Sequence, residues 1–146
     1  MKGQTLRVLT ILGALLVMTA ATAHAQSERT EVTYVPFNFV VGKKTLPAGA
    51  YVVRPNRARS NDVWVVQSKD GDASALFTTT AVQSSKTAKR TKLVFNKYGD
   101  QYFLSQIWFD GSNSGRELVK RQKERELEKN IARGTVVLSD GVALKD

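Results

Sequence analysis

The chain has 146 residues, with 22 Lys and Arg against 13 Asp and Glu, one His and no Cys. This length allows one ordinary domain. The lack of Cys excludes disulfides and thiolate metal sites, and one His is too few for most imidazole-based metal or catalytic centres.

Residues 1–25 have the pattern of a secretory signal peptide. Lys2 and Arg7 form a basic head, residues 8–21 are an apolar run of 14 residues, and Ala23-His24-Ala25 is a small-x-small cleavage signal. The apolar run is shorter than the about 20 residues that span a bilayer. We therefore predict cleavage near Ala25 and a periplasmic or secreted product.

Cleavage would change the chemistry available to the remaining chain, residues 26–146. Loss of Lys2 and Arg7 leaves 20 basic and 13 acidic residues in 121, a net charge of +7, and the leader also takes every His and Met with it. Ser-His-Asp and Cys-His catalysis then lack their imidazole. We expect a non-catalytic protein with no cofactor and no metal. No Cys follows the apolar run to carry a lipid, and no second long apolar stretch follows it as a transmembrane anchor.

Short runs rich in β-branched and aromatic residues predict about seven to nine strands in a single domain. Pro36 lacks an amide donor and should split the first run, residues 31–41. Asp70-Gly71 between two such runs predicts a hairpin with a type I′ turn, and Tyr98-Gly99-Asp100 predicts a second tight connection. The other expected features are strands at 51–53, 63–68, 73–80, 91–95 and 102–109, turns at 42–44 and 46–49, and a last hairpin at 135–144 that turns at Asp140-Gly141.

The strand expected at 102–109 has apolar residues on both faces. One face carries Tyr102, Leu104 and Trp108, and the other carries Phe103, Ile107 and Phe109. Such a strand belongs in the middle of a small barrel or a two-sheet sandwich, with the following element covering its outer side. The predicted fold class is therefore all-β with one C-terminal surface helix.

That helix is expected at about residues 115–133. Ser114 and Glu117 match a capping box at its start, and Gly134 suits its C-terminal cap. Charged residues cover most of its surface. The apolar stripe that should dock it on the sheet is narrow and consists of Val119, Leu127 and Ile131.

Two acidic motifs have simpler explanations than metal binding or catalysis. Asp70 and Asp72 are paired carboxylates, which can bind a metal or act in acid–base catalysis, but the Asp-Gly turn already accounts for them. Residues 110–115 (DGSNSG) are similar to the start of a calcium loop, yet the twelfth position is Arg121, where a bidentate Glu is needed, so helix capping explains these residues better. A hydrolase using Asp70 or Asp72 would need both carboxylates in a cleft, about 5–10 Å apart.

Basic side chains gather in two expected loops, residues 55–61 and 83–90. If these loops meet at one end of the sheet, they form a cationic patch for acidic polysaccharide, lipopolysaccharide phosphate or extracellular nucleic acid. Plain solvation of surface cations is the alternative. The candidate polyanion-binding residues are Arg54, Arg57, Arg59, Lys86, Lys89, Arg90 and Lys92.

The aromatic residues allow a second function. Trp64, Phe103 and Trp108 lie in expected strands, where packing explains them better than base stacking, so no specific nucleic-acid recognition is expected. Aromatic-rich strands can also line a cavity for an apolar ligand inside a small barrel. Two functions therefore stay open, an envelope-associated module that binds acidic polymers and a small barrel that carries an apolar ligand.

Several segments of the chain resemble a group of known sequences. The run VPFNFVVGKKTLPAGAYVV, the hairpin QSKDGDASALF, the segment KLVFNKYGDQYFLSQIWFDG and the closing GRELVKRQKERELEKN resemble small exported bacterial proteins of unknown function, of an acidobacterial type. The similarity covers nearly all of residues 26–146 and implies export, but no activity, ligand or site residue. The LPAGAY turn alone is also similar to turns in prealbumin-like and immunoglobulin-like β-sandwich modules of bacterial surface proteins.

Overall fold

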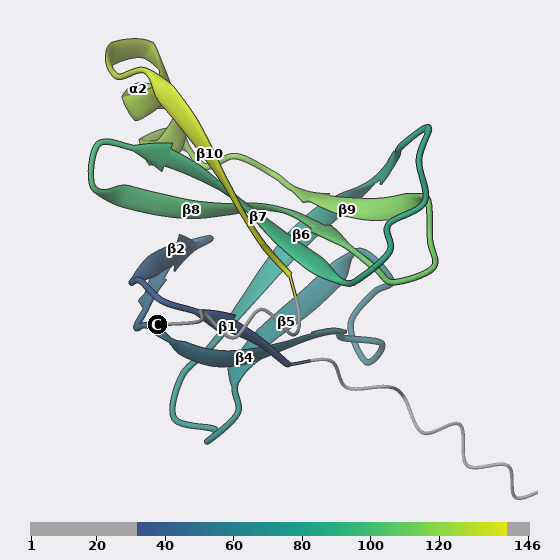
Figure 1. The fold of residues 1–146 in the computed structure, drawn as a ribbon. Helices are drawn as coiled ribbons and strands as arrows, with labels where there is room; N and C mark the ends of the chain where they lie inside the picture. The colour runs from purple at the N-terminus through teal and green to yellow at the C-terminus, as the bar shows by residue number, and fades with distance from the viewer. Residues whose placement is uncertain (1–31, 140–146) are drawn as a thin grey trace, which may run out of the picture.

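The computed structural model describes residues 32–139, and within this range the chain forms ten strands and one short helix (Figure 1). The all-β class with a helix near the C-terminus is confirmed. The expected signal peptide lies outside the described residues. The strands are β1 (Val32–Val35), β2 (Phe39–Val41), β3 (Lys44–Leu46), β4 (Gly49–Pro55), β5 (Val63–Ser68), β6 (Ser74–Gln83), β7 (Lys92–Tyr98), β8 (Gln101–Trp108), β9 (Ser114–Leu118) and β10 (Arg133–Ser139), and the helix is α2 (Gln122–Asn130).

One sheet is bent into two layers by the long strand β6. Its first half, Ser74–Thr78, pairs with β5 in the layer that also holds β1 and β4. Its second half, Thr79–Gln83, pairs with β9 in the layer that also holds β7, β8 and β10. Figure 1 shows the two layers above and below the interior. The strand pairs are antiparallel, apart from a short parallel contact between β2 and β8.

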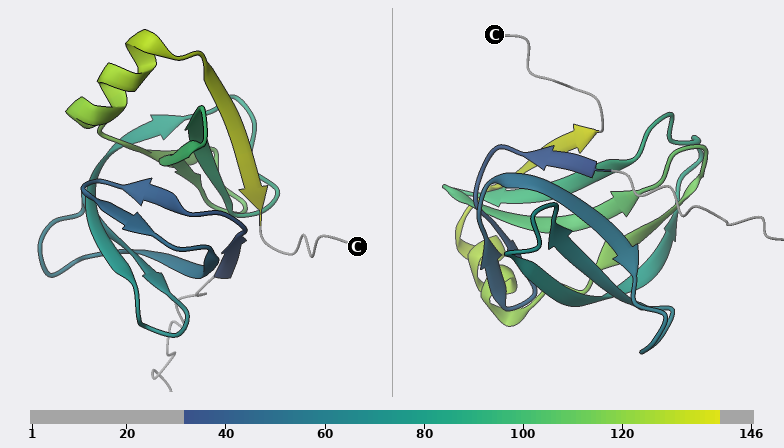
Figure 2. Two further views of the ribbon diagram at one scale, coloured as in Figure 1. Left: turned by 90° about the vertical axis from the view of Figure 1, so that its left-hand side faces the viewer. Right: turned by 90° about the horizontal axis from the view of Figure 1, so that it is seen from below.

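The sheet does not close into a barrel. The edge strands β1 and β10 come into contact, and both views of Figure 2 show the end of β10 beside β1, but the two strands are not paired. Of the two architectures that the sequence left open, the structure therefore has the layered one.

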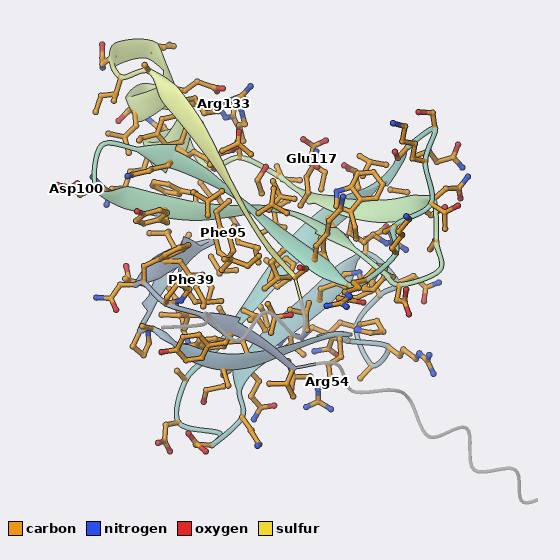
Figure 3. The ribbon with its side chains drawn as sticks, viewed as in Figure 1. Phe39, Arg54, Phe95, Asp100, Glu117 and Arg133 are labelled. Carbon is orange, nitrogen blue, oxygen red and sulfur yellow. The ribbon has the colours of Figure 1, made fainter. Side chains whose placement is uncertain are left out.

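The core between the layers consists of aromatic and aliphatic side chains. Pro36 splits the first run into β1 and β2, as predicted, and the chain between them brings Phe37 inward. Phe39 contacts the rings of Tyr51 and Phe95 edge-to-face, with centroid separations of 5.0 and 5.4 Å. Figure 3 shows Phe39 of β2 and Phe95 of β7 close to each other in the interior. All three rings are essentially inaccessible to water, so they anchor the core.

The hairpin between β5 and β6 forms at the predicted place, but its turn type differs. A type I′ turn needs positive φ at both central residues, and here Gly71 has a φ of +84° while no non-glycine residue of the described chain has a positive φ. The loop has five residues, 69–73, and the Ser68 carbonyl accepts a 3.0 Å hydrogen bond from the Gly71 amide. A loop of this length is usually built around a type I turn, whose two central residues both have negative φ.

A bulge in β8 breaks the alternation that the sequence predicted there. Phe95 pairs with Leu104 and Val94 pairs with Gln106, so Ser105 is the extra residue. Leu104 and Ile107 consequently both belong to the buried core, although strict alternation placed them on opposite faces. The extra residue lets both side chains reach the interior.

The helix predicted at 115–133 is wrong in its first third, because residues 114–118 form strand β9. Gly115 lies against β8 so closely that an added Cβ would be 2.7 Å from the Ile107 carbonyl oxygen and from the Trp108 ring. Glycine here serves the close approach of two strands, and the capping-box pattern at Ser114 is coincidental. Gly134 is likewise inside β10, and the helix ends at Ile131 with an extended backbone.

Helix α2 docks through a buried polar contact and through only one residue of the predicted apolar stripe. Val119 and Ile131 lie outside the helix and stay 51% and 40% exposed, whereas Leu127 is half-buried and the Glu124 side chain is buried. Glu124 Oε1 accepts a 2.8 Å hydrogen bond from Asn96 Nδ2 on β7. Asn96 shares the outer face of β7 with Tyr98, and Tyr98 packs on Phe103 of β8 with ring centroids 5.8 Å apart. The outer face of these strands is thus covered, as the sequence indicated.

The end of the chain is partly described. Strand β10 follows the helix and pairs along its whole length with β7. The return strand of the expected last hairpin, residues 142–144, lies outside the described residues.

Candidate functional site

The seven candidate cations lie on two loops and their flanking strands. Arg54, Arg57 and Arg59 belong to the end of β4 and the β4–β5 loop, and the other four belong to the β6–β7 loop and the first residue of β7. Lys92 is half-buried and its Nζ lies 5.8 Å from the centroid of the Trp108 ring. The exposed members are Arg54, Arg57, Arg59, Lys86, Lys89 and Arg90.

The β4–β5 loop is held by its own backbone. The Asn56 carbonyl accepts hydrogen bonds from the amides of Arg59 and Ser60, at 3.1 and 3.3 Å, and the Asn56 amide donates to the Val63 carbonyl at 2.8 Å. At the start of the loop, Arg54 Nη2 donates to Gln67 Oε1 at 3.1 Å. The loop therefore presents its arginines from a fixed frame.

The β6–β7 loop is held by a neighbouring connection, the β8–β9 loop at residues 109–113. Ala88 is buried in the middle of the loop, where its amide donates to the Ser112 carbonyl at 2.8 Å and its carbonyl accepts from the Gly111 amide at 2.9 Å. The Asp110 amide also donates to Thr91 Oγ1 at 3.0 Å. Lys86, Lys89 and Arg90 therefore project from a pinned backbone.

Both basic loops lie at the same end of the molecule, on the right in Figure 1, but they are not adjacent. The Thr79 amide donates to the Asp62 carbonyl at 2.9 Å, which places the β4–β5 loop beside the middle of β6. The β6–β7 loop begins at Ser84, five residues further along the chain. At about 3.4 Å per residue, the two loops are separated by about 17 Å along β6.

An ion pair that sequence reasoning missed lies between the two loops. Arg116 Nη1 of β9 is 3.3 Å from Asp62 Oδ1 of the β4–β5 loop. The same guanidinium lies over the Trp64 ring, 5.6 Å from its centroid, and Trp64 stacks on Phe109 at 5.2 Å. The expected helix had placed Arg116 in its first turn, and no pattern near Asp62 points to a partner 54 residues away.

We call this whole end, with its three loops and the start of β9, the basic end. It carries eight basic side chains, which are the seven predicted residues and Arg116, against three acidic side chains. The acidic residues are Asp62, Asp110 and Glu117. This end is therefore strongly cationic on a backbone that is fixed by hydrogen bonds.

The acidic motifs behave as turns. Asp70 and Asp72 are exposed at the tip of the β5–β6 hairpin, so they do not line a cleft as the hydrolase hypothesis required. In residues 110–115, Gly111 has a φ of +70° and Ser112 Oγ accepts a 3.0 Å hydrogen bond from the Ser114 amide. Within residues 32–139, no group of three or more Asp, Glu, His or Cys side chains could hold a metal ion.

The interior holds the buried aromatic and aliphatic side chains of the core. One partly open pocket of about 260 Å³ lies elsewhere, between the β2–β3 turn, β6 and the end of β9. It is lined by Gly42, Phe77, Thr78, Leu118, Val119 and Arg121. This pocket is separate from the basic end.

Comparison with family models, with curated proteins and with solved structures gave no match. Helix α2 has nine residues, and none of the described helical structure has the length and apolar character needed to cross a bilayer.

Proposed function

We propose that the protein is an exported, non-catalytic module that binds acidic polymers of the cell envelope through its basic end. The observation that carries this proposal is the excess of eight basic over three acidic side chains on hydrogen-bonded loops at one end of the sheet. Binding to cations on a fixed backbone costs less conformational entropy than binding to cations on a mobile loop, because the backbone is already ordered. The pinned backbone therefore favours a binding surface over simple solvation.

Binding of this kind depends on salt. A polyanion carries condensed counterions, and each contact with a basic side chain releases some of them. Six of the seven predicted cations are exposed, so a polymer can reach them from solution without a change in the fold. Affinity should accordingly fall steeply as the salt concentration rises.

A heparin column with a salt gradient tests the proposal. The basic-end variant is Arg54→Gln, Arg59→Gln, Lys86→Gln and Lys89→Gln. The control variant loses the same charge elsewhere, at exposed residues of the β2–β3 turn, the β5–β6 hairpin and helix α2, through Lys43→Gln, Lys69→Gln, Lys123→Gln and Lys129→Gln.

The wild type and the control should elute at similar salt concentrations, and the basic-end variant should elute much earlier. If both variants elute earlier than the wild type by the same amount, the column responds to the net charge of the protein and not to the basic end. Elution of the wild type together with a neutral protein of similar size would overturn polyanion binding altogether.

A further inference from the structure

The two basic loops form separate contact areas on one rigid frame. Strand β6 runs from the β4–β5 loop to the β6–β7 loop and is paired with β9 over this stretch. The separation of about 17 Å, at 3.4 Å per residue, is therefore fixed by a paired strand. A small anion cannot reach from one loop to the other.

We infer that one linear polyanion lies along the basic end and contacts both loops at once. This inference rests on the proposed function and specifies its ligand as a flexible polymer whose charged groups extend over more than about 17 Å, the span of five strand residues. Single phosphate or sulfate groups would bind each loop separately and weakly. Once a polymer is bound at one loop, its contact with the second is intramolecular, which multiplies the affinity.

The region between the loops supports such a path. Arg116 lies there, on the β9 strand that pairs with this part of β6, and its guanidinium contacts Asp62 and the Trp64 ring. Its positive charge is partly offset by the Asp62 carboxylate. Glu117 follows Arg116 on β9, opposite Thr80 of β6, and its side chain points to the other face of the strand. On the face of Arg116, the two strongly basic areas are thus joined by a weakly charged stretch.

The test compares tripolyphosphate with long-chain inorganic polyphosphate, both measured by isothermal titration calorimetry at low salt. The affinity is expressed per phosphate unit, so that the larger number of sites on the long chain does not count as tighter binding. Two single-loop variants are used, Arg54→Gln with Arg59→Gln and Lys86→Gln with Lys89→Gln. The control is Lys43→Gln with Lys69→Gln.

The wild type and the control should bind the long chain at least tenfold more tightly per phosphate than tripolyphosphate. Either single-loop variant should lose most of this length advantage, because its remaining loop binds alone. If the advantage survives in both single-loop variants, bridging is wrong while polyanion binding stands. If the wild type binds neither polyphosphate, both the bridging and the proposed function fail.

Discussion

Asn96 on β7 donates a 2.8 Å hydrogen bond to Glu124 on helix α2, and both side chains are buried. This contact joins a mostly charged helix to the outer face of the sheet. A buried polar group without its hydrogen-bond partner costs about 1–3 kcal/mol. Loss of this bond would therefore destabilise the protein mainly by leaving a buried polar group unpaired.

Replacing Glu124 by Ala should destabilise the protein by about 1–3 kcal/mol, because the Asn96 amide then stays buried without an acceptor. Chemical denaturation followed by far-UV circular dichroism measures this change. Glu126→Ala is the matched control, since Glu126 is exposed on the same helix and bonds only Gln122 and Asn130 within it. Equal effects of the two substitutions would mean that Glu124 does not hold the helix.

The buried tyrosines should respond differently to loss of their hydroxyl groups. Tyr51 Oη donates a 2.7 Å hydrogen bond to the Pro47 carbonyl, so Tyr51→Phe should cost about 0.5–1.5 kcal/mol. Tyr98 Oη is buried with no hydrogen-bond partner of ordinary geometry among the described residues, so Tyr98→Phe should be neutral or stabilising. Thermal melts of the two variants measure the difference. A lower melting temperature for Tyr98→Phe than for Tyr51→Phe would contradict the prediction.

Alkaline pH should destabilise the fold through the same side chains. Burial raises the pKa of Tyr51, and burial together with the Glu124 and Glu128 carboxylates raises the pKa of Tyr98. A raised folded-state pKa means that this stabilisation is complete below the ordinary tyrosine pKa of about 10 and is lost as the pH rises through the folded-state value. Tyrosinate absorbance at equilibrium should therefore rise together with the loss of circular dichroism, and Tyr98→Phe should move the alkaline transition upward.

Acid pH should weaken the contacts of Glu128 on helix α2. A 2.6 Å hydrogen bond from Lys120 lowers the pKa of this carboxyl, and Arg133 contributes at 3.3 Å. A lowered folded-state pKa gives stabilisation that is present above the ordinary carboxyl pKa and is lost as the pH falls through the lowered value. Glu128→Gln should consequently have a lower melting temperature than the wild type near pH 7 and the same melting temperature in strong acid. A difference that does not change with pH would contradict a stabilising role for the Glu128 charge.

Gly115→Ala tests the close approach of β9 to β8. The added Cβ would be 2.7 Å from the Ile107 carbonyl oxygen and from the Trp108 ring, so we expect a loss of about 1–3 kcal/mol from overpacking. Gly134→Ala is the control, because its Cβ would meet nothing closer than 3.6 Å. Urea unfolding of both variants should show a large effect only for Gly115→Ala.

Asp62→Asn should strengthen polyanion binding. The substitution removes one of the three acidic charges of the basic end and leaves Arg116 free to contact the polymer. One such charge contributes on the order of 1 kcal/mol in water, about a fivefold gain in affinity. Glu126→Gln removes a negative charge on helix α2 and should leave the affinity for long-chain polyphosphate almost unchanged. An unchanged or weaker affinity of Asp62→Asn would argue against Arg116 as part of the path.

Local patterns were reliable where they depend on nearby residues. The Pro36 break, strand 63–68 and the tight connection at Gly99-Asp100 were all predicted, because a missing amide donor, a β-branched run and a glycine turn act within a few residues. The Ser105 bulge and the β9 strand were not predicted. Both depend on packing against a neighbouring strand, which overrides local preference.

The candidate site was predicted in composition but not in arrangement. The seven cations could be listed from the sequence because loops rich in Lys and Arg are visible there. Their separation depends on how far β6 extends beyond β5, and the Arg116–Asp62 pair depends on β9 being a strand. Neither relationship has a local sequence signal.

Strand β6 also has a consequence for the way the molecule comes apart. Because its two halves supply backbone hydrogen bonds to different layers, neither layer keeps a complete edge if this strand is lost. The layers should therefore melt in one cooperative transition, with no intermediate in which one layer survives alone. A nick in the middle of β6 should separate the protein into two fragments that fold only when they are mixed.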